Sequence, residues 1–267
     1  MRVIPVIDVL NGVVVRGIAG RRSEYRPIVS KLTSSTDPVE VARVLIDAAQ
    51  PSELYLADLD AVQGGKPALD VYRRIRALGV EIWVDAGVEG VESARRIAEA
   101  GCHVVAGLET VPGMVELREI VAAIGESRVV FSLDLRDGKP LRDWLFSPLS
   151  ASERGAGGER SAAGLASNPS PQPPPRSGEG EPERIAVCAV ECGITRMIVL
   201  DLARVGVGKG TGTEELCQQI ASTYPHLEVI AGGGVSNRTD LSRLGLLGIR
   251  GVLAASALHD GGLRTED

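Results

Sequence analysis

The chain has 267 residues, a net charge of −6 and 44% hydrophobic residues, and these values restrict its fold and its partners. The acidic balance argues against a nucleic-acid partner, because no basic stripe is present to displace counterions from phosphates. No apolar run approaches the roughly 18 residues that a membrane span requires. The N-terminal MRVIPVIDVL is typical of a strand rather than of a signal peptide, so we expect a cytoplasmic protein.

Eight short runs rich in Val and Ile alternate with helix-like segments along the chain. They cover residues 3–8, 54–59, 81–85, 103–107, 128–135, 196–202, 228–231 and 251–255. Helix-start signals lie between them, such as Thr36-Asp37-Pro38, where a proline suits the first helical turn. Eight repeats of strand and helix predict one α/β domain over residues 1–267, a (β/α)8 barrel of the ribulose-phosphate-binding type.

The two halves of the chain resemble each other. EIWVDAGV at 81–88 aligns with EVIAGGGV at 228–235, and VVAGLE at 104–109 aligns with VLAASA at 252–257. The segment 38–59 likewise aligns with 182–202, and 6–9 with 132–135. Four matched segments in the same order indicate an internal duplication at the scale of a half-barrel.

Residues from about 147 to 183 do not fit this pattern, because Gly, Pro, Ser, Ala and charged residues dominate them. Such a composition buries too little apolar surface to offset the entropy of ordering. We expect a disordered insertion in the loop after the fifth strand; a substrate lid is the alternative.

Acidic side chains stand at the ends of the predicted strands, which meet at one mouth in a barrel. They are Asp8, Asp58, Asp60, Asp85, Glu109, Asp134 and Asp201. Asp8 and Asp134 are related by the duplication, so we expect them to face each other and divide the roles of general acid and general base. The alternative that strand-end aspartates only cap the following loops stays open, above all for Asp58 and Asp60.

A glycine-rich turn, AGGGVSN at 231–237, follows the seventh strand and predicts a phosphate cradle. Gly232, Gly233 and Gly234 would supply backbone N–H groups, with Ala255 and Ser256 after the eighth strand. In the first half, Asp85 aligns with Gly232 and Glu109 with Ala257. Two carboxylates would repel a phosphate dianion there, so a cationic group, a hydroxyl-bearing group or a metal is more plausible.

Three further residues are candidates for the substrate pocket. Arg16 and Lys209 could neutralise a ligand anion, although both could equally be solvated surface residues. Trp144 could stack on a planar ligand or simply pack in the protein. The four cysteines (Cys102, Cys188, Cys192 and Cys217) form no CxxC pair, so we expect buried thiols and no metal site.

The motifs IPVIDVLNGVVVR, LADLDAVQGGKP, FSLDLRDGK, AGGGVSN and GVLAASAL resemble, in order and spacing, the histidine-biosynthesis barrels. These are the phosphoribosylformimino-aminoimidazole carboxamide ribotide isomerase and the cyclase subunit of imidazole-glycerol-phosphate synthase. The resemblance covers the chain except about 147–183 and leans toward the isomerase. It implies an Amadori rearrangement without a cofactor, with Asp8 and Asp134 as the acid–base pair and Trp144 near the family's loop tryptophan.

The chain departs from that family in two places. In the family's sixth-strand signature, which resembles T-D-I-D-R-D-G-T, the first threonine, a catalytically important aspartate and the final threonine are replaced here by Leu200, Val205 and Val207. The first-half phosphate site is lost at Asp85, Leu108 and Glu109. The isomerase substrate carries a phosphate at each end, and a chain with one cradle should bind it poorly.

We therefore expect a divergent paralogue, an enzyme of isomerase type acting on a small, singly phosphorylated metabolite. The authentic ribotide isomerase is the second interpretation, and a non-catalytic ligand-binding or assembly barrel is the third. The sequence leaves the oligomeric state open.

Overall fold

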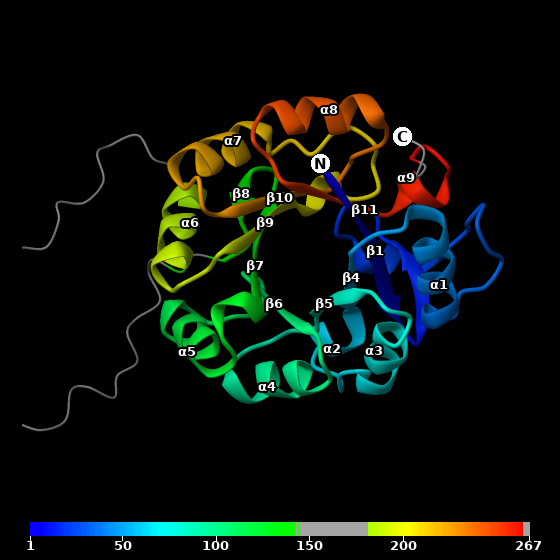
Figure 1. Cartoon of the computed structure of the whole chain (residues 1–267), viewed down its shortest axis with the longest axis horizontal. Coiled ribbons are helices and arrows are strands. Elements are labelled where there is room, and N and C mark those ends of the chain that lie inside the picture. The colour runs from blue at the N-terminus through cyan, green and yellow to red at the C-terminus, as the bar shows by residue number, and fades with distance from the viewer. Residues whose placement is uncertain (143, 145–180, 264–267) are drawn as a thin grey trace, which may run out of the picture.

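The computed structural model describes residues 1–142, 144 and 181–263, and its centre is a closed barrel of parallel strands (Figure 1). Neighbouring strands are hydrogen-bonded in the order β1, β4, β5, β6, β7, β9, β10 and β11, and β11 pairs with β1 to close the ring. The eight predicted strands are all present, and their ends differ from the predicted ones by at most two residues. In the same order, their bounds are Arg2–Leu10, Glu53–Asp58, Glu81–Asp85, His103–Gly107, Val129–Arg136, Arg196–Asp201, Glu228–Gly232 and Gly251–Ala254.

Helices form a ring outside the strands (Figure 1), which confirms the (β/α)8 barrel. The first of them begins where the sequence predicts, because the Asp37 carboxylate accepts hydrogen bonds from the backbone N–H groups of Val39 and Glu40. The described helices are α1 Pro38–Ala49, α2 Leu59–Val62, α3 Leu69–Arg76, α4 Val91–Glu99, α5 Met114–Ile124, α6 Glu181–Glu191, α7 Glu214–Thr223, α8 Arg238–Leu246 and α9 Ser256–His259, with 3-10 turns η1 Arg22–Glu24, η2 Glu126–Arg128 and η4 Leu202–Arg204.

Two hydrophobic layers hold the barrel together. The larger one lies between strands and helices and includes Ile7, Leu45 and Ile97. The smaller one includes Ile4, Trp83, Val130, Ile198 and Ile230, side chains of alternate strand positions that fill the barrel interior. The interior is therefore packed, and open space for a ligand lies at one end.

Two short antiparallel extensions widen that end of the barrel. After β1 the chain turns back into β2 (Val13–Arg16), which pairs with β3 (Arg26–Pro27); after β7 it turns back into β8 (Lys139–Pro140). The turn residues Asn11-Gly12 and Asp137-Gly138 all have positive φ, as a two-residue hairpin loop requires. Sequence analysis missed both extensions, although Asn-Gly and Asp-Gly are the signals for such turns.

The expected insertion at about 147–183 lies mostly outside the described residues. The predicted C-terminal boundary of the insertion was wrong by three residues, because Glu181–Glu183 form the first turn of α6. Pro182 stands in that turn, where a helix tolerates proline. Within the part of the chain that the structure describes, no helix is long and apolar enough to cross a membrane.

Candidate active site

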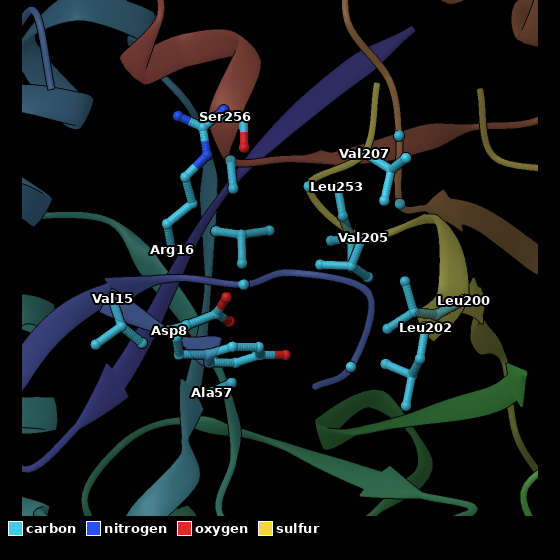
Figure 2. A pocket seen from close by; sticks show the side chains of 18 of the residues that line it. Asp8, Val15, Arg16, Ala57, Leu200, Leu202, Val205, Val207, Leu253 and Ser256 are labelled. Atoms are coloured by element: carbon cyan, nitrogen blue, oxygen red, sulfur yellow. The ribbon is translucent and has the colours of Figure 1, made fainter. Parts of the chain in front are cut away.

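A cavity of about 510 Å³ opens at the carboxyl ends of the barrel strands, and both Asp8 and Asp134 line it. Asp8 lies on β1 and Asp134 on β7, four strands apart in a ring of eight, so the strands that carry them are opposite each other. The expectation that the two carboxyl groups share one cavity therefore agrees with the geometry. Figure 2 shows Asp8 facing the space between Arg16, Ser256 and a group of Leu and Val side chains.

Asp134 is buried, and two donors hold its carboxylate. The Ser132 hydroxyl donates a hydrogen bond to Oδ1 at 2.6 Å, and the Glu109 backbone N–H donates to Oδ2 at 3.4 Å. Burial raises the pKa of Asp134 to about 7 despite the Ser132 hydrogen bond, and the charges of Asp85 and Glu109 add to the rise. This carboxyl is thus protonated far more readily near neutral pH than an ordinary aspartate.

Asp8 is in a similar electrostatic state. Burial raises its pKa to about 7, the charge of Asp85 raises it further, and the Arg22 guanidinium opposes them. A Cβ atom placed on Gly17 would lie 3.0 Å from Oδ2 of Asp8 and 3.1 Å from Cγ1 of Val205. Glycine at position 17 therefore lets the backbone after β2 approach the Asp8 carboxyl closely.

The first-half position that aligns with the phosphate cradle is filled by the protein's own carboxylates. Oδ1 of Asp85 accepts from the Gly87 backbone N–H at 3.3 Å, and Oδ2 accepts from the Tyr55 hydroxyl at 3.2 Å. Burial raises the pKa of Asp85 to about 6. Glu109 forms an ion pair of 2.7 Å with Arg22. The Asp85 carboxylate thus accepts the hydrogen bond from the Gly87 N–H group that an anionic ligand would need.

The second-half position has Gly232 and Ala257 where the first half has Asp85 and Glu109. Gly233, Gly234, Ala255 and Ser256 line the cavity, and in the described part of the chain no protein group accepts a hydrogen bond from the backbone N–H of Gly233, Gly234 or Ser256. Gly234 has φ +74°, and a Cβ atom there would lie 2.2 Å from the Gly210 carbonyl oxygen. The glycines thus keep open a turn that presents N–H groups to the cavity.

Gly232 differs from the other predicted cradle residues. It is the last residue of β10, pairs with Leu200 in the strand ladder, and is not part of the cavity lining. Its place is under the cradle, where a Cβ atom would lie 2.8 Å from Leu200 Cδ1 and 3.3 Å from Leu253 Cδ1.

One wall of the cavity is apolar, and we call it the apolar wall. It lies opposite Asp8 in Figure 2 and comes mainly from the end of β9 and the loop that follows. Its members are Leu200, Leu202, Val205, Val207 and Leu253.

Several predicted pocket residues lie outside the cavity lining. Asp58 is buried and accepts hydrogen bonds from Ala61, Ala68 and Tyr72, so it holds the turn after β4. Asp201 is also buried, and its carboxylate accepts from the backbone N–H groups of Asp137, Gly138 and Ala203, so it anchors the hairpin after β7. Both aspartates cap loops, the alternative that the sequence left open.

Trp144 and Lys209 also lie outside the lining, whereas Arg16 lies in it. Trp144 is buried, its ring centroid lies 5.1 Å from that of Phe131, and its Nε1–H donates to the Val111 carbonyl at 3.0 Å. Lys209 is exposed on the loop after β9. The Arg16 guanidinium is paired with Asp260 through contacts of 2.8 and 3.3 Å.

Sequence reasoning missed several polar residues that line the cavity: Arg22, Tyr25, Tyr55, Arg136, Ser236, His259 and Asp260. Tyr55 points inward from the middle of β4, and alternation along that strand could have identified it. Arg22 and Tyr25 lie in the extension after β1, which was not predicted. Burial lowers the pKa of His259 to about 4, and its Nδ1 lies 2.9 Å from the Ser30 hydroxyl.

In the described residues no group of three or more His, Cys, Asp or Glu side chains could hold a metal ion.

Comparison with known proteins gives one family and several relatives along the whole chain. An uncharacterized protein of Methanocaldococcus jannaschii is 26% identical over 270 residues, which cover 100% of this chain and 97% of that protein. A protein of Leuconostoc mesenteroides is 26% identical over 97% of this chain and 94% of its own length. One of Desulforudis audaxviator is 29% identical over 98% of this chain and 87% of its own length. Both are named as isomerases of an imidazole-4-carboxamide that carries two phosphoribosyl groups.

The family model described as "Histidine biosynthesis protein" matches residues 2–264, nearly the full length of the chain. The resemblance drawn from the sequence motifs is thereby confirmed, at an identity that fits a divergent member. On this match and on the barrel it shares, the chain belongs to the histidine biosynthesis protein family.

Proposed function

We propose that the protein is an isomerase-type enzyme that moves a proton on a small molecule carrying a single phosphate. Asp8 and Asp134 are the acid–base pair, and the cradle of Gly233, Gly234, Ala255 and Ser256, with Gly232 beneath it, holds the phosphate. The observation that carries the proposal is that two carboxyl groups on opposite strands line one cavity, each with its pKa raised to about 7.

Those pKa values suit isomerisation chemistry at neutral pH. A base removes a proton from the carbon beside a carbonyl or imine, and an acid protonates the oxygen or nitrogen as the double bond moves. A carboxyl with a pKa near the working pH is present in both forms, so either aspartate can take either role. The charge of Asp85 raises the pKa of both aspartates and so favours their protonated forms.

The limit to one phosphate follows from the asymmetry of the two halves. Asp85 and Glu109 occupy the first-half position, and their negative charges, of which Arg22 offsets one, repel a second dianion. The acidic side suits a cationic or a hydroxyl-bearing group instead.

The authentic ribotide isomerase is the second candidate, because relatives matched over nearly the whole chain are named as that isomerase. Expression of the full chain in a histidine auxotroph that lacks this enzyme separates the two. Growth without histidine supports the second candidate, and no growth supports the first.

Solvent exchange tests the acid–base pair without knowledge of the substrate. Carbonyl-bearing monophosphates are incubated with the protein in D₂O, and loss of the C–H signal is followed by NMR. We expect exchange with the wild type and a loss of about 100-fold or more in Asp8→Asn and in Asp134→Asn. Asp47→Asn, an exposed carboxylate on α1, is the control. Undiminished exchange in both site variants would contradict the proposal and favour a non-catalytic barrel.

A further inference from the structure

The apolar wall forms a continuous surface between the proposed cradle and Asp8. At one end, Leu200 and Leu253 both flank Gly232, since a Cβ atom there would lie 2.8 and 3.3 Å from their Cδ1 atoms. At the other end, Val205 and Asp8 both flank Gly17, at 3.1 and 3.0 Å from the corresponding position. A ligand that reaches from the cradle to Asp8 on this side of the cavity therefore lies along Leu and Val side chains.

This wall offers no side-chain hydrogen bond. Every residue that β9 and the following loop contribute to the cavity lining is Leu, Val or Gly: Leu200, Leu202, Val205, Gly206, Val207 and Gly208. A hydroxyl pressed against such a surface loses its hydrogen bonds to water and gains none, which costs free energy. An unhydroxylated carbon skeleton gains free energy in the same place.

The wall is also incompletely covered by the protein itself. The Val207 side chain is 39% exposed, and Leu200 and Val205 are partly exposed, although all three border one cavity. The cavity volume of about 510 Å³ is in the range of sites for small organic ligands. Apolar side chains exposed inside a ligand-sized cavity favour a ligand whose adjoining surface is apolar.

We propose that the body of the substrate, between its phosphate and its reacting carbon, is a compact apolar ring or chain and not a polyhydroxylated sugar. This inference rests on the proposed phosphate cradle and specifies the substrate class of the same site. The phosphate lies on Gly233 and Gly234, the apolar body lies on Leu200, Val205 and Leu253, and the reacting end meets Asp8 and Asp134.

A matched pair of probes tests the inference on the full-length wild type. Cyclohexyl phosphate and inositol 1-phosphate share a six-carbon ring and one phosphate and differ in the ring hydroxyls. Calorimetric titration should show cyclohexyl phosphate binding at least about tenfold more tightly, and inorganic phosphate should compete with it. Equal or tighter binding of inositol 1-phosphate would overturn the inference.

The same titrations separate failure of the inference from failure of the proposed function. If inorganic phosphate binds and the inositol ester is preferred, the cradle stands and only the apolar body is wrong. If neither inorganic phosphate nor either ester binds, the proposed cradle fails and the inference fails with it.

Two variants test whether the apolar wall causes the preference for cyclohexyl phosphate over inositol 1-phosphate. Val205→Thr keeps the shape of the side chain and adds a hydroxyl, so it should reduce the preference for cyclohexyl phosphate by about threefold or more. Val115→Thr makes the same change on α5, outside the cavity, and should leave the preference unchanged. A preference that is identical in both variants would contradict the assignment to Val205.

Discussion

The Ser132 hydroxyl donates a 2.6 Å hydrogen bond to Oδ1 of Asp134, two residues along the same strand. This hydrogen bond lowers the pKa of a carboxyl that burial raises to about 7. The Ser132 hydroxyl therefore favours the ionised form of Asp134, against the larger effect of burial.

Removal of this hydrogen bond should move the pKa of Asp134 upward. We expect Ser132→Ala to raise it by about one unit, the usual size of a hydrogen bond to a charged group. The measurement is a carboxyl ¹³C NMR titration, which needs no substrate. Ser93→Ala on α4 is the control, since its hydroxyl bonds only the backbone at the start of that helix. A pKa that falls in Ser132→Ala would show that the hydroxyl stabilises the protonated form instead.

The raised pKa of Asp8 makes folding stability depend on pH with a definite sign. Its pKa is about 7 in the folded chain, against 3.8 for an unperturbed aspartate, so the folded state binds the proton more tightly. The contribution is present below pH 4 and is lost as pH rises from about 4 to about 7.

Asp8→Asn should therefore stabilise the protein most at high pH. We expect its advantage in the free energy of unfolding to be smallest near pH 4 and to exceed about 1.4 kcal/mol, the equivalent of one pKa unit, at pH 8. Denaturant titrations at the two pH values measure it, with Asp47→Asn on α1 as the control. An advantage that shrinks between pH 4 and pH 8 would mean that the folded site stabilises the ionised carboxylate.

The barrel could be predicted from sequence because strand and helix alternate with clear local signals. The aliphatic runs mark strands that are buried on both faces, and Asp37-Pro38 marks the start of α1. The extensions after β1 and β7 were missed because each is only a few residues long. They matter for function, since the first of them brings Arg22 and Tyr25 to the cavity.

The site was predictable only in part, because position at a strand end does not determine where a side chain points. Asp8 and Asp134 face the cavity, whereas Asp58 and Asp201 turn toward the backbone N–H groups of neighbouring loops. Each of these carboxylates has one local donor, Ala61 for Asp58 and Ala203 for Asp201, and at least one donor 10 or more positions away, Ala68 for Asp58 and Gly138 for Asp201. The local caps fit the alternative that the sequence left open, whereas the distant partners leave no local pattern in the sequence.

The loop after β9 depends on a close approach of two backbones. Gly206 has φ +69°, and a Cβ atom there would lie 2.1 Å from the Gly17 carbonyl oxygen. Gly208, in the same loop, has φ +68° and no atom within 4 Å of that position. The two glycines have the same left-handed backbone conformation, and only Gly206 lies against another part of the backbone.

This difference makes Gly206→Ala and Gly208→Ala a matched pair. Gly208→Ala should lower the free energy of unfolding by about 1 kcal/mol, the cost of alanine in a left-handed conformation. Gly206→Ala should cost about 2 kcal/mol more and displace Gly17 from Asp8, so the pKa of Asp8 should change as well. Equal losses of stability in the two variants would show that the loop is free to move away from Gly17.

Trp144 should act on stability and not on ligand binding. Its Nε1–H bonds the Val111 carbonyl, and its ring packs on Phe131 outside the cavity. Trp144→Phe should therefore lower the free energy of unfolding by about 1 kcal/mol and leave the affinity for cyclohexyl phosphate unchanged. A loss of affinity without a loss of stability would support the ligand-stacking role.

A double variant, Asp85→Gly with Glu109→Ala, should give the first half of the barrel a phosphate site. The wild type should bind hexyl phosphate more tightly than hexane-1,6-diyl bisphosphate, because Asp85 and Glu109 repel the second phosphate. The double variant removes both carboxylates, frees the Gly87 N–H and leaves Arg22 without its partner. We expect the order of affinity to reverse, measured by calorimetric titration of both ligands. Glu92→Ala with Glu99→Ala on α4 makes the same change in net charge at exposed sites and should keep the wild-type order. If the control reverses the order as well, net charge and not the cradle position excludes the second phosphate.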